Sequence, residues 1–149
     1  MKNINIYLSF NGDCEEAFNF YRSVFGGEFA VLKRFKDMPA GGLDDSFQIA
    51  DADAEKIMHV QLPLGKNSAL MGNDMPASMG RAESGGNFSI ALETENMAET
   101  DKLFNGLAAG GKIAMPLSKT FWSPYFGMLS DKFGIGWMLD CSSEKPKNH

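Results

Sequence analysis

The chain contains the same short architecture twice, and this internal repeat constrains its fold more than any other feature. An alternating apolar segment, a helical segment and a double glycine follow one another, and the same order returns 84 residues later. The equivalent pairs are Ile6 with Ile90, Leu8 with Leu92, Glu15 with Glu99, Phe20 with Phe104, and Gly26-Gly27 with Gly110-Gly111. A solenoid needs about three or more repeats to bury a continuous core, so two copies predict one pseudo-symmetric domain with a cleft between its halves.

Composition and charge narrow the class of protein. A length of 149 residues suits a single domain with a real core. The net charge is −5 and the basic residues are scattered, so no Lys/Arg stripe is available for phosphates and nucleic-acid binding is not expected. The N-terminal sequence MKNINIYLSF has neither the apolar run of a signal peptide nor the length of a membrane span. Cys14 and Cys141 are too few for a disulfide framework, which predicts a reduced, cytoplasmic protein.

The first copy has clear signals for a strand and a helix. Residues 4–10 alternate between apolar and polar side chains, as a half-buried strand does. Asp13 and Glu16 have the spacing of a capping box for a helix that ends at Gly26-Gly27. The acidic segment 36–55 is predicted to be a long loop or lid. Three further strands are expected, the last two as a hairpin, at 28–35, 56–64 and 68–72.

The second copy repeats this order. A strand at 88–92 precedes a helix that starts with the capping pair Asn96 and Glu99 and ends at about Ala109. Three more strands are expected at 112–115, about 121–129 and 135–140. Strands outnumber helices and the last three strands of each copy lack helical crossovers, so the predicted class is α+β, with two βαβββ modules. The predicted boundaries are module 1 at about 1–72, a linker at 73–86, module 2 at about 87–141, a single domain over 1–142, and a frayed tail over 142–149.

Two βαβββ modules in a chain of this length resemble the vicinal oxygen chelate superfamily, which includes glyoxalase I, bleomycin resistance proteins and extradiol dioxygenases. Within it, the sequence is most similar to the PhnB-like branch. The segments that carry the resemblance are YLSFNGDCEEAFNFYRSVFGGE (7–28), KIMHVQL (56–62) and MPLSKTFWSPYFGMLSDKFGIGWMLDC (115–141). The resemblance implies mixed curved sheets that enclose a small-molecule cavity, helices on the outside, and a homodimer.

The resemblance also indicates where a metal would bind. In the metal enzymes of the superfamily, four ligands reach the cavity from the first and last strands of each module. Those positions correspond here to Ile6, Ser89, Met138 and one residue of the segment 69–71. Divalent cations prefer carboxylate or imidazole ligands, and among these residues only Ser89 offers even a weak oxygen donor. The sequence therefore predicts no metal and no cofactor.

His59 is the one histidine inside the chain and the first candidate for chemistry. Strand parity places His59 and Gln61 opposite Met58, Val60 and Leu62, and the more apolar set is expected to meet the helix. His59 and Gln61 are thus predicted to face the cavity. A neutral imidazole there can exchange a proton near pH 7 or hydrogen-bond a ligand. A histidine satisfied by a neighbouring strand, without a chemical role, is the open alternative.

The aromatic segment TFWSPYFGM, residues 120–128, is the second candidate. Ligand pockets are mostly apolar and aromatic, which favours Trp122, Phe126 and Met128 as cavity residues, although a core needs the same residue types. With Met138 pointing into the cavity, Trp137 must point into the helix-facing core. The predicted ligand-binding set is His59, Gln61, Ser89, Trp122, Phe126, Met128 and Met138.

Three functions are consistent with this reading. The first is a metal-independent protein of the bleomycin-resistance type that binds an apolar or aromatic small molecule. The second is a lyase- or isomerase-type enzyme with His59 as acid/base, in which a divalent metal would have to recruit carboxylates such as Glu93 or Asp140. The third is a dimerisation domain without a ligand. A methyltransferase is not supported, because both double glycines follow helices and act as C-caps rather than as a nucleotide-binding turn.

Overall fold

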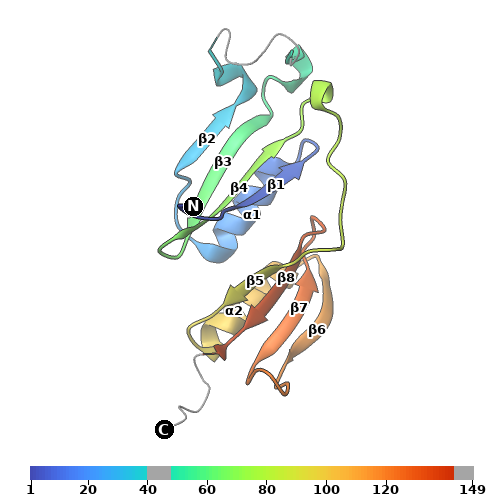
Figure 1. The fold of residues 1–149 in the computed structure, drawn as a ribbon. Helices are drawn as coiled ribbons and strands as arrows, with labels where there is room; N and C mark the ends of the chain where they lie inside the picture. The colour runs from blue at the N-terminus through green and yellow to red at the C-terminus, as the bar shows by residue number, and fades with distance from the viewer. Residues whose placement is uncertain (40–47, 143–149) are drawn as a thin grey trace. The chain divides into compact units, whose positions relative to one another are not determined.

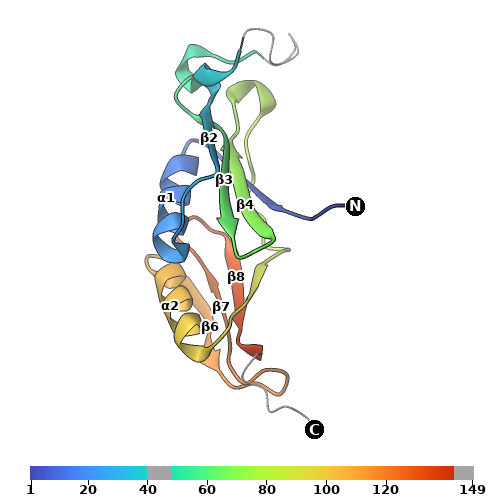
Figure 2. The ribbon, with the colours of Figure 1, turned by 90° about the vertical axis from the view of Figure 1, so that its left-hand side faces the viewer.

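The computed structural model describes residues 1–39 and 48–142, and its chain divides into two compact units, Met1–Glu83 and Ser84–His149. Part of the predicted lid, residues 40–47, and most of the predicted tail lie outside the described residues. In its described residues each unit has one α-helix and one four-stranded sheet, and the α-helix covers one face of that sheet (Figures 1 and 2). The α+β class and the two βαβββ modules are therefore confirmed.

The elements of the two units follow the same order along the chain. The first unit contains β1 (Ile6–Phe10), α1 (Cys14–Phe25), β2 (Val31–Arg34), β3 (Ile57–Leu64) and β4 (Ser68–Asp74). The second unit contains β5 (Ile90–Glu93), α2 (Met97–Ala108), β6 (Lys112–Ser118), β7 (Phe126–Ser130) and β8 (Gly136–Asp140). The sheet orders are β1-β4-β3-β2 and β5-β8-β7-β6, and the first strand is parallel to the last in each unit. Neither described helix has the length and apolar character needed to cross a bilayer.

Helix α1 packs on its sheet through side chains that are fully buried. Ala17, Phe18 and Tyr21 are 0% exposed, and the Phe18 ring meets the Tyr21 ring edge-on with centroids 5.6 Å apart. Gly72 of β4 makes this close approach possible, because a Cβ there would lie 2.7 Å from Cε2 of Phe18 and 2.6 Å from the carbonyl oxygen of Leu8. The core of the first unit therefore lies between α1 and the two central strands.

The second unit builds the same core with other residues. Phe104 and Leu107 of α2 are buried, and a Cβ at Gly127 of β7 would lie 2.7 Å from Cε2 of Phe104. Trp137 of β8 is 0% exposed and donates a hydrogen bond from Nε1 to Asp131 Oδ2 at 2.9 Å. Asp131 also accepts hydrogen bonds from the backbone N–H groups of Phe133 and Ile135. Asp131 thus holds the turn before β8, and the prediction that Trp137 faces the helix is confirmed.

The helix starts differ from prediction in one copy and agree in the other. Asn96 Oδ1 accepts a hydrogen bond from the N–H of Glu99 at 2.8 Å, so the predicted cap of α2 is confirmed. Asp13 makes no side-chain cap, so the predicted Asp13–Glu16 capping box is wrong. Asp74, 1% exposed at the end of β4, replaces it, with Oδ1 accepting hydrogen bonds from the N–H groups of Gly12 and Cys14 at 2.8 and 3.0 Å.

Two further differences concern element bounds and the repeat. The strand expected from about 121 begins only at Phe126, because Ser123 and Thr120 hydrogen-bond each other in a turn before it. The starts of α1 and α2, at residues 14 and 97, are 83 residues apart, whereas the starts of β1 and β5, at residues 6 and 90, are 84 residues apart. Tyr21, and not Phe20, is consequently the buried equivalent of Phe104.

Candidate functional site

The first unit presents an open side of its sheet, opposite α1, and its side chains are mainly polar. The register aligns Tyr7 with Met71 and Met71 with Gln61, so these three side chains form a row across β1, β4 and β3. Ser9 pairs with Asn73 in the next row, and His59 pairs with Lys33 of β2. We call this surface the first open face, and its members are Tyr7, Ser9, Val31, Lys33, His59, Gln61, Met71 and Asn73.

His59 lies on this face as strand parity predicted, while Val60 and Leu62 are buried on the helix side. The Tyr7 ring stacks on the imidazole at a centroid distance of 5.7 Å and an interplanar angle of 21°. Tyr7 Oη lies 3.3 Å from His59 Nδ1, so one group can donate to the other. Partial burial raises the pKa of the Tyr7 hydroxyl, so this group stays protonated near neutral pH.

Tyr7 was missed at the sequence level, because the first-strand cavity position was assigned to Ile6. Ile6 pairs with Leu70, which is 0% exposed, so Ile6 belongs to the helix side of the sheet. A signal was available, since the alternation in β1 puts Leu8 and Phe10 inward and therefore Tyr7 outward. Ile6 was therefore the wrong position, and Tyr7 is the neighbouring residue of β1 that lies on the open face.

The second unit presents an open side that is mainly apolar. Met138 of β8 pairs with Met128 of β7 and with Ala91 of β5, and Met128 pairs with Met115 of β6. In the next row Phe126 pairs with Asp140, and Asp140 with Glu93. We call this surface the second open face, and its members are Ala91, Glu93, Met115, Phe126, Met128, Met138 and Asp140.

Trp122 precedes β7 and covers one end of the second open face. Its ring lies edge-on to Phe126 at a centroid distance of 5.4 Å and to Phe121 at 4.7 Å. Trp122 is 45% exposed, whereas Phe126 beneath it is 5% exposed. Trp122 therefore lies together with Phe126, Met128 and Met138. Ser89 lies just before β5, beside Gly136. His59 and Gln61 belong to the other unit.

In the described parts of the two units, the donors that a metal would need do not come together. Glu93 and Asp140 are neighbours across β5 and β8, but serine hydroxyls already bind both carboxylates: Ser142 donates to Glu93 and Ser123 to Asp140. Over residues 1–39 and 48–142, no group of three or more His, Cys, Asp or Glu side chains could hold an ion. Among the residues that the structure describes, Glu93 and Asp140 alone supply too few donors for a divalent cation.

Neither cysteine of the chain is placed as a nucleophile. Cys14 and Cys141 are buried and form no disulfide bond. Burial, followed by the charge of Asp74, raises the pKa of the Cys14 thiol far above its usual range, so it stays protonated and unreactive.

Comparisons with known proteins agree with this fold. The sequence model of the Glyoxalase/Bleomycin resistance protein/Dioxygenase superfamily matches residues 3–139. Protein YjdN of Escherichia coli (strain K12) is 32% identical over 146 residues, which cover 94% of this chain and 95% of YjdN. The crystal structure of protein PA1353 from Pseudomonas aeruginosa is 41% identical, with a TM-score of 0.77 over 94% of this chain and 97% of that chain.

A PhnB protein from Bacillus cereus is 28% identical, with a TM-score of 0.72 over 93% of this chain and 98% of its own. The resemblance to the PhnB-like branch is therefore supported by a solved structure as well as by sequence segments. The family match spans both units and nearly all of their strands and helices. The chain belongs to the glyoxalase/bleomycin resistance protein/dioxygenase superfamily.

Proposed function

We propose that the chain is a small-molecule-binding protein that works without a metal ion and holds an apolar or aromatic ligand on the second open face. The observation that carries this proposal is the contact of Trp122 with Phe126 beside Met128 and Met138. A half-exposed indole over a buried ring offers a flat apolar surface that a second aromatic ring can extend. Methionine side chains are flexible and polarizable, so they adapt to the shape of such a ligand.

The polar groups near this surface orient a ligand more readily than they react with it. Serine hydroxyls hold both carboxylates: Ser123 donates to Asp140 and Ser142 donates to Glu93. A few fixed polar groups at the rim of an apolar surface are typical of sites that recognise a ligand.

Trp122→Ala tests the binding proposal. Loss of the indole should weaken binding of a small aromatic probe such as phenylethanol by about 1–3 kcal/mol, as removal of an aromatic anchor does. Isothermal titration measures the change. Phe88→Ala is the matched control, because Phe88 is exposed and lies outside the second open face. Equal affinities of the two variants would contradict the proposal, and a stoichiometric Zn, Ni, Mn or Fe in the purified protein would contradict its metal independence.

A second candidate function is an enzyme of the lyase or isomerase type with His59 as acid/base. The observation that favours it is the stacked Tyr7–His59 pair, because a tyrosine that fixes the imidazole orientation suits proton transfer. Any turnover found should fall by about 10²–10⁴-fold in His59→Ala, the usual contribution of a general acid or base. Retained affinity for aromatic probes in that variant would separate the two functions.

The remaining expectations are part of the same proposal. We expect a homodimer, following the resemblance to the superfamily, and sedimentation analysis measures it directly. Two buried cysteines without a disulfide bond suit a reducing compartment, so we expect the protein in the cytoplasm. A dimer that binds none of a broad set of small molecules would favour the third reading, a dimerisation domain.

A further inference from the structure

We propose that the first unit has a separate binding site for a small organic anion, in a polar groove at the hairpin end of its sheet. The groove has a volume of about 560 Å³ and lies between the segment before β1 and the turn that joins β3 to β4. The residues that define it are Lys2, Asn5, Gln61, Lys66, Asn67 and Ser68. The second open face and its aromatic residues take no part in it.

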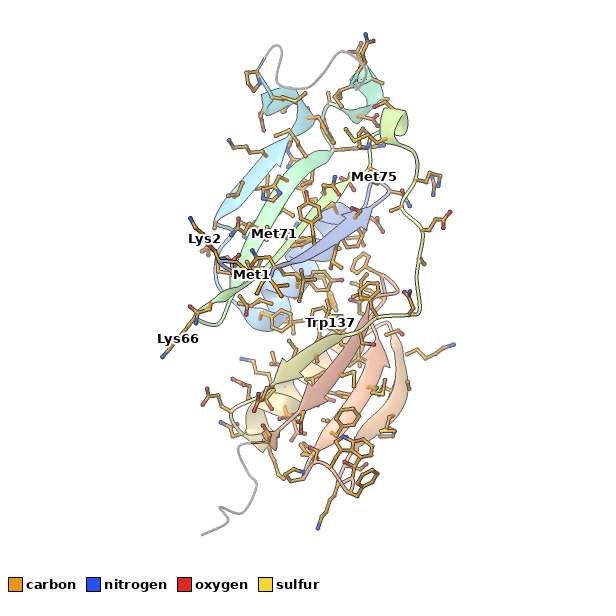
Figure 3. All side chains as sticks on the ribbon, in the orientation of Figure 1. Met1, Lys2, Lys66, Met71, Met75 and Trp137 are labelled. Carbon is orange, nitrogen blue, oxygen red and sulfur yellow. The ribbon has the colours of Figure 1, made fainter. Side chains whose placement is uncertain are left out.

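Two segments that are distant in sequence form the walls of this groove. Lys66 extends from the β3–β4 turn and Lys2 from the segment before β1 (Figure 3). This segment leaves the sheet on the side opposite α1 (Figure 2). The groove therefore opens on the same side as the first open face.

The charge of the groove selects the ligand. Its lining contains two lysines and no carboxylate, although the whole chain has a net charge of −5. In the described part of the chain, neither Lys2 nor Lys66 forms an ion pair with an acidic side chain. Two ammonium groups without a protein counterion attract an anion, and they repel a metal cation. Two charges are too few for a nucleic-acid backbone, which leaves a small molecule.

Amide groups in the groove can complete the coordination of the anion. Asn67 and Gln61 each offer an NH₂ group with two hydrogens, and Ser68 offers a hydroxyl. Asn5 donates one of its hydrogens to Asn3 Oδ1 at 3.1 Å, which fixes the orientation of its side chain at the groove wall. A carboxylate or a phosphate group has enough acceptor positions to use several of these donors together.

Gln61 connects the groove to the first open face. The register pairs Pro63 with Ala69 and Gln61 with Met71. The row of Pro63 and Ala69, which lines the groove, therefore lies beside the row of Tyr7, Met71 and Gln61. Rows on one face of a sheet are about 7 Å apart, because two residues separate them along each strand. An anion in the groove would therefore place a short apolar or aromatic body over Met71, with Tyr7 in the same row and His59 one row further.

The experiment is a heteronuclear NMR titration of the full chain with phenylacetate, phenyl phosphate and the neutral phenylethanol. The two anions should shift the side-chain amide signals of Gln61 and Asn67 and the backbone signals of 66–69. Exposed lysine contacts are individually weak, so we expect Kd values of about 1 mM that rise with salt. Phenylethanol at equal concentration should shift these signals about fivefold less. A response to only one of the anions identifies the group that the site prefers.

The variant pair tests the lysines directly. Lys2→Gln combined with Lys66→Gln should weaken anion binding about tenfold, because both ammonium charges are lost. Lys102→Gln combined with Lys119→Gln changes the net charge equally at exposed positions of the second unit and should have no effect. Equal shifts from the alcohol and the anions, or equal affinity of the two double variants, would overturn the inference. The Trp122 indole signal reports the second open face in the same titration, so the two proposals are judged separately.

Discussion

The two units share one frame and differ most on their open faces. Gln61 and Met128 occupy equivalent positions, because each lies opposite the central methionine of its sheet, Met71 or Met138. One row further, His59 of the first unit corresponds to Phe126 of the second. On the helix side, by contrast, both units bury large apolar side chains against a glycine of a central strand. Packing constrains the covered face of a repeat, whereas its open face is free to acquire separate chemical roles.

The units also differ in how they begin their helices. In the second unit, Asn96 caps α2 from the adjacent position in sequence. In the first unit, the buried carboxylate of Asp74 accepts hydrogen bonds from three backbone groups, the N–H of Gly12, Cys14 and Ile57. A local cap stabilises one helix end, while Asp74 connects the start of α1 with the end of β4 and the start of β3.

The largest effect expected from this comparison is on stability. Asp74→Ala leaves three backbone donors without their acceptor and should cost the first unit about 3 kcal/mol. Asn96→Ala, its counterpart in the second unit, should cost about 1 kcal/mol. Urea unfolding followed by NMR signals of each unit measures both values. Equal losses of unfolding free energy in the two variants would contradict this expectation, because Asp74 would then stabilise its unit no more than Asn96 does.

Exchanging the equivalent open-face residues should have an intermediate effect. Met128→Gln removes apolar surface beside Phe126 and should weaken phenylethanol binding by about 1 kcal/mol. Gln61→Met makes the reverse change on the first open face and should leave that affinity unchanged. Both side chains are half-buried, so the free energy of unfolding should change by less than about 1 kcal/mol in either variant. Trp122 fluorescence follows the titration, and weakening by Gln61→Met instead would assign the ligand to the first open face.

The smallest effect concerns acid stability of the first unit. Lys56, 2.7 Å from Asp53, and the N–H of Ala77 hold the pKa of the Asp53 carboxyl below its usual range. A lowered native pKa contributes stability above the unfolded value of about 3.9, and this contribution is lost as the pH falls through the native pKa. Asp53→Asn should therefore be less stable than the natural protein at neutral pH and converge with it below about pH 4. A constant difference from pH 7 to pH 3 would contradict this assignment.

Strand parity predicted most of what the sheets show. The outward position of His59 and the inward position of Trp137 both follow from a period of two residues, which tertiary contacts did not override. The cluster of Phe126, Met128 and Met138 was predicted for the same reason, since each residue alternates with a buried neighbour. The functional roles of these residues, and the union of the two units in one domain, stay predictions.

Contacts between distant segments were not readable in the same way. Asp74 lies 60 residues from Cys14, so its role as a cap has no local signature and the nearer Asp13 was chosen instead. The late start of β7 depends on the turn between Thr120 and Ser123, which competes with extended pairing of the aromatic segment. The groove of Lys2 and Lys66 exists only once the segment before β1 and the β3–β4 turn are brought together.

The triple acceptor at Asp74 also has a kinetic consequence. The amide hydrogens of Gly12, Cys14 and Ile57 are bound to a single carboxylate, although they belong to the beginnings of a helix and a strand that are far apart in the chain. Opening of any one of these segments loosens the acceptor that the other two share. Their exchange with solvent deuterium should therefore occur together, in one cooperative event of the first unit.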